Sequence, residues 1–232
     1  MALKGKMIRM KMADGAEIGV YHVEPQGERR GGLVLIQEIF GVTDHIRECC
    51  DSYAAEGYEV LGPALYDREA PGLEASYSPE DIQKCIKIAR ELHPLDLSLA
   101  DTQTCIDALK NKGPVFITGY CYGGSISWLA ACRLTGLAAA SGFYGSLVPA
   151  TASEQPKCPV ILHFGEHDHG IPMEGVEKVK AAHPEVPVYV YDAGHGFNSD
   201  RRADYNDAAA KLAKQRTLQL FRANGGERSA YI

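Results

Sequence analysis

The sequence predicts an α/β fold with a mostly parallel central sheet, helices on both faces and an antiparallel hairpin at the N-terminal end. Short apolar runs alternate with helical patterns along most of the chain, which is typical of successive strand and helix units. Several runs are apolar at every position, as in strands that are covered on both faces. No repeat, low-complexity run or long linker divides the 232 residues, so we expect one domain over residues 1–232.

Local patterns predict the elements of the first half. Residues 7–12 and 16–23 flank a tight turn and predict the hairpin. Ser78 followed by Pro79 is a typical helix start, because serine caps the first turn and proline fits its first position. In order, we expect strands over 32–37 and 58–62, and helices over 44–57, 78–92 and 95–112.

The second half continues the alternation. We expect strands over 114–120, 137–144, 159–165 and 186–191, with helices over 125–133, 174–182 and 200–223. An alternating order after an antiparallel start is the arrangement of the α/β-hydrolase sheet.

The composition excludes several classes of function. A net charge of −6 gives no basic field that would attract nucleic acid or anionic lipid. Seven cysteines, an odd number without a Cys-x-x-Cys pair, are a poor framework for disulfides or zinc and fit a reducing compartment. The first residues never reach an apolar stretch long enough for a signal peptide or a membrane span. We therefore expect a cytoplasmic protein that acts on small molecules.

The segment Gly-Tyr-Cys-Tyr-Gly-Gly over 119–124 is the strongest functional signal. It joins a strand to a helix, and Gly119 and Gly123 leave room for a sharp turn that presents Cys121. The first peptide N–H groups of the helix would favour a thiolate or an oxyanion over that turn. This is the nucleophile-elbow pattern with cysteine in place of serine, and a buried structural cysteine is the alternative.

Two later loops supply partners for this thiol. Asp168 follows the strand that ends at 165, and His195 follows the strand that ends at 191. The order nucleophile, acid, base is that of the α/β-hydrolase template. We predict that His195 is the general base for Cys121 and that Asp168 orients it, with Glu166 as the rival acid.

The histidines around Asp168 also admit a metal hypothesis. Imidazole and carboxylate groups are common zinc ligands, and His163, His167 and His169 lie close in sequence. Strand alternation separates His163 from its neighbours, and no second cluster has ligand spacing. We therefore expect structural or solvent-facing roles for them, and no metal or other cofactor.

A further loop, Gln-Glu-Ile-Phe-Gly over 37–41, ends the first long parallel strand. Burying the Glu38 carboxylate costs free energy unless it has a function, and an exposed loop acid is the alternative. In this fold the loop supplies an oxyanion donor, so the backbone N–H groups of Ile39 and Tyr122 should face a developing oxyanion.

Together these motifs resemble the dienelactone hydrolases. The matching segments cover nearly the whole length: Gln-Glu-Ile-Phe-Gly-Val over 37–42, Gly-Tyr at 57–58, Tyr66 with Ala-Pro-Gly over 70–72, the elbow over 119–124, residues 165–168 and Ala-Gly-His-Gly-Phe over 193–197. The resemblance implies hydrolysis of an enol-lactone such as a carboxymethylenebutenolide through a thioacyl-enzyme. It also implies that Glu38 holds the resting Cys121 thiol and is displaced when substrate enters.

The chain departs from the family at the residues that bind substrate. Two arginines clamp the substrate carboxylate in family members that act on dienelactone, and their positions align with Cys85 and Ser199 here. Arg68, Arg201 and Arg202 could supply a carboxylate partner from other positions, with solvated surface charges as the alternative.

Aromatic side chains should form the wall of the substrate pocket. Tyr66, Tyr122, Tyr144 and Phe197 are the candidates, with ordinary core packing as the alternative for each.

The leading hypothesis is thus a cysteine hydrolase of small lactones or esters. A non-catalytic ligand-binding or sensor protein on the same scaffold is one alternative, and a redox role for Cys121 is another. The redox role lacks a nearby resolving cysteine, because Cys132 lies further along the same helix. The patterns favour neither a monomer nor a homodimer.

Overall fold

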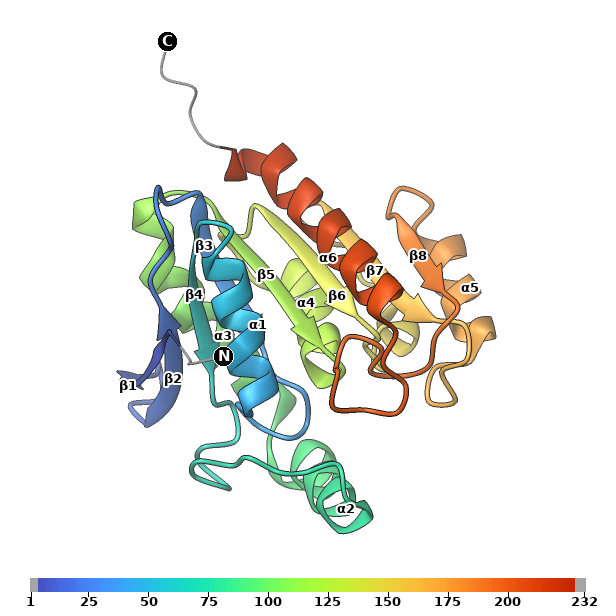
Figure 1. Ribbon diagram of the computed structural model, residues 1–232, viewed down its shortest axis with the longest axis horizontal. Helices are drawn as coiled ribbons and strands as arrows, with labels where there is room; N and C mark the ends of the chain where they lie inside the picture. The colour runs from blue at the N-terminus through green and yellow to red at the C-terminus, as the bar shows by residue number, and fades with distance from the viewer. Residues whose placement is uncertain (1–3, 228–232) are drawn as a thin grey trace.

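An eight-stranded sheet forms the centre of the computed structural model, which describes residues 4–227 (Figure 1). The strands are β1 (Lys6–Lys11), β2 (Glu17–Val23), β3 (Gly31–Ile36), β4 (Tyr58–Pro63), β5 (Val115–Tyr120), β6 (Ala139–Phe143), β7 (Val160–Gly165) and β8 (Val188–Tyr191). Their order across the sheet is β1-β2-β4-β3-β5-β6-β7-β8. The pairs β1·β2 and β2·β4 are antiparallel and all other pairs are parallel. This confirms the predicted fold class with its antiparallel start.

Helices cover both faces of the sheet. The α-helices are α1 (Asp44–Ala54), α2 (Pro79–Lys87), α3 (Leu95–Leu109), α4 (Tyr122–Arg133), α5 (Met173–Ala182) and α6 (Asp207–Phe221). Shorter turns are η1 (Ile88–Leu92), η2 (Lys110–Lys112), η3 (Pro149–Thr151) and η4 (Arg222–Gly226). In Figure 1, α1 and α6 lie in front of the sheet and α3 and α4 behind it. Within residues 4–227, no helix is long and apolar enough to cross a membrane.

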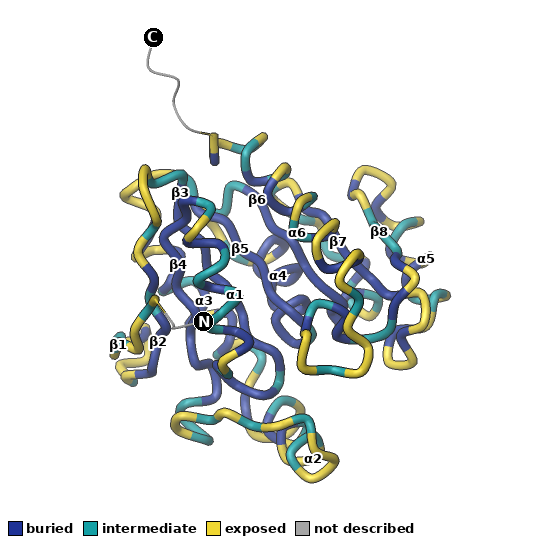
Figure 2. The backbone as a smooth tube through the Cα atoms, viewed as in Figure 1, coloured by how far each residue is buried: buried dark blue, intermediate teal, exposed yellow. Residues whose placement is uncertain are grey.

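The core lies along the central strands. Every residue of β3, β4, β5 and β7 is buried. The continuous apolar run of β3 predicts this for a strand that is covered on both faces. The edge strand β1 is largely exposed. Figure 2 shows the same division, with buried strands in the middle and exposed backbone around α2.

Two predicted helices differ from the structure. The helix expected over 78–92 is α-helical only to Lys87 and continues as the π-helical turn η1. The closing helix begins at Asp207 rather than at 200, so that prediction was wrong by seven residues. The cause is a cap at Asn206, whose side chain accepts a hydrogen bond from the Ala209 N–H at 3.0 Å. Residues 200–206 instead form turns, with the Asn206 N–H bound to the Phe197 carbonyl at 3.0 Å.

The turn between β5 and α4 is packed tightly against neighbouring backbone. A Cβ atom added at Gly123 would lie 2.3 Å from the carbonyl oxygen of Ile36 in β3. At Gly124 it would lie 2.1 Å from the carbonyl oxygen of Phe143 in β6. Because backbone atoms cannot rotate away as side chains do, only glycine fits these two positions.

We predict that Gly124→Ala destabilises the protein by about 3 kcal/mol or more, because its methyl group would overlap the Phe143 carbonyl. Urea unfolding followed by circular dichroism measures the change. Gly175→Ala in α5 is the matched control, since its Cβ would meet only the Pro149 side chain, at 3.1 Å. Equal losses in the two variants would contradict the packing argument.

Candidate active site

Cys121 occupies the turn between β5 and α4 in a strained backbone conformation, with φ +57° and ψ −113°. Its N–H donates to the Phe143 carbonyl at 3.0 Å, and its carbonyl accepts from the N–H groups of Gly124 and Ser125 at 3.0 and 3.2 Å. These bonds hold the turn in place. The partly exposed side chain lines a cavity of about 400 Å³.

Asp168 and His195 meet at the same cavity, from the loops after β7 and β8. Asp168 Oδ2 lies 2.7 Å from His195 Nδ1. The other carboxylate oxygen, Oδ1, accepts from the N–H groups of Gly170 and Ile171 at 2.8 and 3.1 Å. The Asp168 side chain is fully buried, so these bonds fix its orientation. They also leave His195 Nε2 as the ring nitrogen that is available to Cys121.

The electrostatics couple the imidazole to the thiol. Burial lowers the pKa of His195, but the charge of a Cys121 thiolate and the bond to Asp168 outweigh burial and raise it to about 10. His195 can therefore hold the proton that the thiol gives up, as nucleophilic attack by a cysteine requires.

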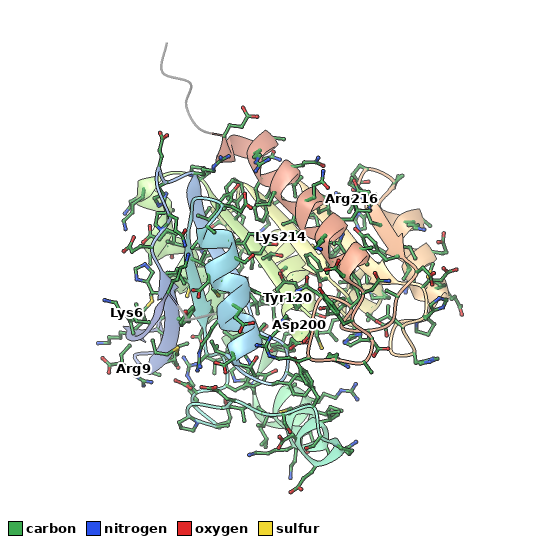
Figure 3. All side chains as sticks on the ribbon, viewed as in Figure 1. Lys6, Arg9, Tyr120, Asp200, Lys214 and Arg216 are labelled. Atoms are coloured by element: carbon green, nitrogen blue, oxygen red, sulfur yellow. The ribbon has the colours of Figure 1, made fainter. Side chains whose placement is uncertain are left out.

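A second thiol and imidazole pair lacks this activation. Cys49 Sγ lies 3.8 Å from His45 Nε2, beside a cavity of about 240 Å³ between α1 and α6, where Figure 3 labels Tyr120 and Lys214. Burial raises the pKa of Cys49 to about 12 and lowers that of His45 to about 4. Both groups are therefore neutral at physiological pH, and Cys49 is a poor nucleophile.

Glu38 is completely buried beside this site. Its Oε2 accepts a hydrogen bond from the Tyr77 hydroxyl at 2.9 Å, and its Oε1 lies 4.0 Å from an Arg202 nitrogen. Burial raises the pKa of Glu38, and the Tyr77 hydrogen bond and the charges of Arg202 and His195 oppose this rise. Among the described residues, the hydrogen-bond partner of Glu38 is Tyr77 rather than the Cys121 thiol expected from the family resemblance.

The cavity brings Ile39 and Tyr122 together with the thiol and the imidazole. It is also lined by Arg90 of η1, a charged residue that the sequence analysis missed. The π-helical turn there changes the phase of the helix, so α-helical periodicity does not indicate which face Arg90 occupies. The remaining lining residues not predicted are Ile86, Ala89, Ser146, Leu147, His167, His169, Gly170 and Asp204.

Three predicted aromatic wall residues lie in the core instead. Tyr66, Tyr144 and Phe197 are at most 1% exposed and do not line the cavity. The Tyr144 ring lies between those of His195 and Phe197, with both ring centres 5.1 Å away. These rings support the wall from behind, and Tyr122 is the aromatic residue that lines it.

The predicted arginines are also placed elsewhere. Arg68 binds Asp101 through two hydrogen bonds of 2.7 and 2.9 Å and also pairs with Asp14, which leaves it no free face for substrate. Arg201 pairs with Glu48 at the surface.

Arg202 packs against Gly196 and over the Tyr77 ring, 5.3 Å from its centre, and is therefore a partner of the Glu38 region rather than a cavity residue. Cys85 and Ser199, the positions aligned with the family arginines, are both fully buried.

Among the described residues, two groups of side chains could hold a metal ion, one at the rim of this cavity and one remote from it. Glu166, His167 and Asp192 are exposed and offer ligand atoms within 4.8 Å of one another. His22, Glu24 and Glu59 form the other group. His163 is not part of either, because its Nδ1 is bound to the Tyr191 hydroxyl at 2.9 Å in the core.

Comparison with known proteins identifies the relatives of this arrangement. The model of the dienelactone hydrolase family matches residues 18–225. The chain belongs to the dienelactone hydrolase family. The protein named "Putative carboxymethylenebutenolidase" of Salmonella typhimurium is 35% identical over 93% of this chain and 86% of its own. "Carboxymethylenebutenolidase 1" of Cupriavidus pinatubonensis is 28% identical over 92% of this chain and 95% of its own.

A solved structure gives the same result. The "Putative Dienelactone Hydrolase" of Klebsiella pneumoniae superimposes with a TM-score of 0.83 at 30% identity, covering 95% of this chain and 99% of its own. This dienelactone hydrolase family member therefore has the predicted α/β-hydrolase fold. Membership also confirms the prediction of a hydrolase that acts on esters or lactones.

We predict that Cys121→Ala lowers the pKa of His195 below about 10, because the thiolate charge that raises it most is removed. NMR titration of the imidazole measures the change. Cys158→Ala is the matched control, because this partly exposed thiol does not line the cavity. An unchanged His195 titration in Cys121→Ala would contradict the coupling.

The coupling between Cys121 and His195 should also affect how the free energy of unfolding depends on pH. The pKa of folded His195 lies above its ordinary value of 6.5, so its contribution to stability is fully present below pH 6.5 and is lost as the pH rises through about 10. Over that window, the free energy of unfolding of the wild type should therefore fall more steeply than that of Cys121→Ala. Urea titrations at several pH values measure both slopes.

Proposed function

We propose that the protein hydrolyses small lactones or esters through a Cys-His-Asp triad and a thioacyl-enzyme. One observation carries this proposal: the 2.7 Å hydrogen bond between Asp168 and His195 lies at the cavity that Cys121 lines. Because Asp168 occupies Nδ1, His195 can exchange a proton with the thiol only through Nε2.

The proposed reaction has two halves. His195 takes the thiol proton, and the Cys121 sulfur attacks the carbonyl carbon while the carbonyl π electrons move to oxygen. The backbone N–H groups of Ile39 and Tyr122 bind this oxyanion. Its collapse breaks the bond to the alcohol or enol oxygen, which receives the proton from His195. Water, deprotonated by His195, then attacks the thioester, and the carbon–sulfur bond breaks to regenerate the thiol.

Glu38 belongs to this proposal as an acid next to the triad. The Glu38 carboxylate attracts a protonated His195 ring, which supports the imidazolium that forms once His195 has taken the thiol proton. The resting contact with the thiol that the family resemblance implies is part of the proposal, and Glu38 Oε1, which has no hydrogen-bond partner among the described residues, is the oxygen that could make it.

For the substrate, we propose a lactone or ester that carries a carboxylate, as the names of the carboxymethylenebutenolidase relatives suggest. Arg90 supports this class, because it is an arginine that lines the cavity. A guanidinium is the group best shaped to bind a carboxylate through two hydrogen bonds.

We also propose that the chain forms a single domain and resides in the cytoplasm. All eight strands belong to one sheet, which supports the first point. The seven cysteines are free, which supports a reducing compartment.

Cys121→Ala should abolish turnover of activated esters and of dienelactone, because it removes the sulfur that forms the proposed acyl-enzyme. Stopped-flow or steady-state hydrolysis assays measure the loss, and Cys158→Ala should retain wild-type rates. Unchanged turnover in Cys121→Ala would refute the proposal. Saturable ligand binding by folded wild-type protein without any turnover would favour the ligand-binding alternative.

Arg90→Gln should raise KM for carboxylated lactones about tenfold, the loss expected for one hydrogen-bonded charge, and leave KM for neutral esters unchanged. Steady-state kinetics with paired substrates, with and without the carboxylate, measure the difference. Lys87→Gln removes a nearby exposed charge that does not line the cavity and serves as the control. Equal effects on the two substrates would contradict a carboxylate contact at Arg90.

A further inference from the structure

A second row of acid, histidine and serine side chains lies behind the cavity. Glu69 Oε2 is 2.9 Å from His93 Nδ1, and His93 Nε2 is 2.9 Å from Ser98 Oγ. Ser98 Oγ is in turn 2.8 Å from the Tyr122 hydroxyl. The row thus runs from a partly exposed carboxylate to an aromatic residue of the active-site cavity.

This row is not a second catalytic triad. Ser98 is fully buried, and among the four members only Tyr122 lines the cavity. A substrate carbonyl could not reach the Ser98 oxygen, whose contacts are already taken by His93 and Tyr122. Any effect of Glu69, His93 and Ser98 on the active site must therefore pass through Tyr122.

The chemistry of the groups fixes the direction of each hydrogen bond. The Glu69 carboxylate accepts, so the Nδ1-protonated tautomer of His93 pairs with it and accepts through Nε2. Ser98 then donates to His93 and accepts from the Tyr122 hydroxyl. Burial, and to a smaller degree the charge of Glu69, raises the pKa of Tyr122 to about 12, although the Ser98 bond lowers it, so the phenol remains a donor at physiological pH.

Tyr122 connects this row to the reacting atoms. It follows Cys121 directly and is the first residue of α4. Its backbone N–H is one of the two proposed oxyanion donors, while its side chain is tied to Ser98 of α3 and packs on Tyr66, with ring centres 5.5 Å apart. The side chain therefore anchors the first turn of α4 to a different helix.

We propose that Glu69, His93 and Ser98 are positioning residues for hydrolysis, which hold Tyr122 so that its backbone N–H points at the oxyanion. This inference rests on the proposed function. The oxyanion exists only during reaction, so loosening its donor lowers kcat and leaves KM nearly unchanged. Removing an oxyanion donor outright costs about 10²–10³ in kcat, and we expect about tenfold or more from misplacing one.

The test compares Ser98→Ala, Tyr122→Phe and their double variant in ester hydrolysis. We expect each single variant to lower kcat with little change in KM, and the double variant to lower it no further, because both break one link. Ser141→Ala is the matched control: it removes another fully buried serine hydroxyl, 2.8 Å from Thr217, away from the cavity. It should retain wild-type kcat even if its Tm falls.

A second readout does not depend on turnover. Butyraldehyde can add reversibly to Cys121 as a hemithioacetal. The sulfur bonds to the carbonyl carbon, the π electrons move to the oxygen in the oxyanion position, and the thiol proton passes through His195 to that oxygen. Calorimetry measures its affinity. We expect weaker binding in Ser98→Ala and Tyr122→Phe than in Ser141→Ala.

The outcomes separate the two proposals. Turnover that does not require Cys121 would refute the proposed function. Cys121-dependent turnover with wild-type kcat and aldehyde affinity in folded Tyr122→Phe would overturn the positioning role alone. If Ser98→Ala does not fold, Tyr122→Phe decides, since it retains the ring. Multiplying losses in the double variant would also overturn the positioning role, because they would mean that the two hydroxyls act independently.

Discussion

The strained turn at Cys121 is the constraint on which the rest of the site depends. Cys121 and Tyr144 are the two non-glycine residues with positive φ in the described chain, and they follow the adjacent strands β5 and β6. The Cys121 N–H is bound to Phe143, the last residue of β6. The neighbouring strand β6 thus helps to hold the strained turn. The same Phe143 carbonyl leaves no room for a methyl group at Gly124.

The rigid turn fixes the position of the Cys121 thiol relative to the His195 imidazole. The thiol lies at the start of α4, and the imidazole comes from the loop after β8. Buried bonds to backbone N–H groups fix Asp168, so the imidazole has one fixed orientation. A charge pair in such a setting needs no rearrangement before reaction, and this preorganisation is what a nucleophile requires.

The sequence predicted which loops meet at the site, because these loops follow strand ends. It did not predict which arginine lines the cavity, because that depends on the direction of individual side chains. Cys121, Asp168 and His195 each follow a strand of a parallel sheet, so topology alone brings their loops to one edge. Arg90 was missed because a π-helical turn shifts the face that it occupies. Arg68 was misassigned because its partner Asp101 is distant in sequence and invisible to local patterns.

Two of the histidine–carboxylate pairs among the described residues show why such a motif does not by itself define a triad. Asp168 and His195 resemble Glu69 and His93 in chemistry and in distance, at 2.7 and 2.9 Å. What differs is the third group and its access to a ligand. The first pair meets a thiol that lines a cavity, whereas the second meets a serine with no exposed surface. In the proposed reaction the first carboxylate stabilises charge that develops on the imidazole, and in the proposed positioning role the second sets the polarity of a hydrogen-bonded row. We therefore expect the same pairing to serve as a base where the third group, the Cys121 sulfur, can reach substrate. Where the third group is the buried Ser98 oxygen, we expect it to anchor the first turn of α4.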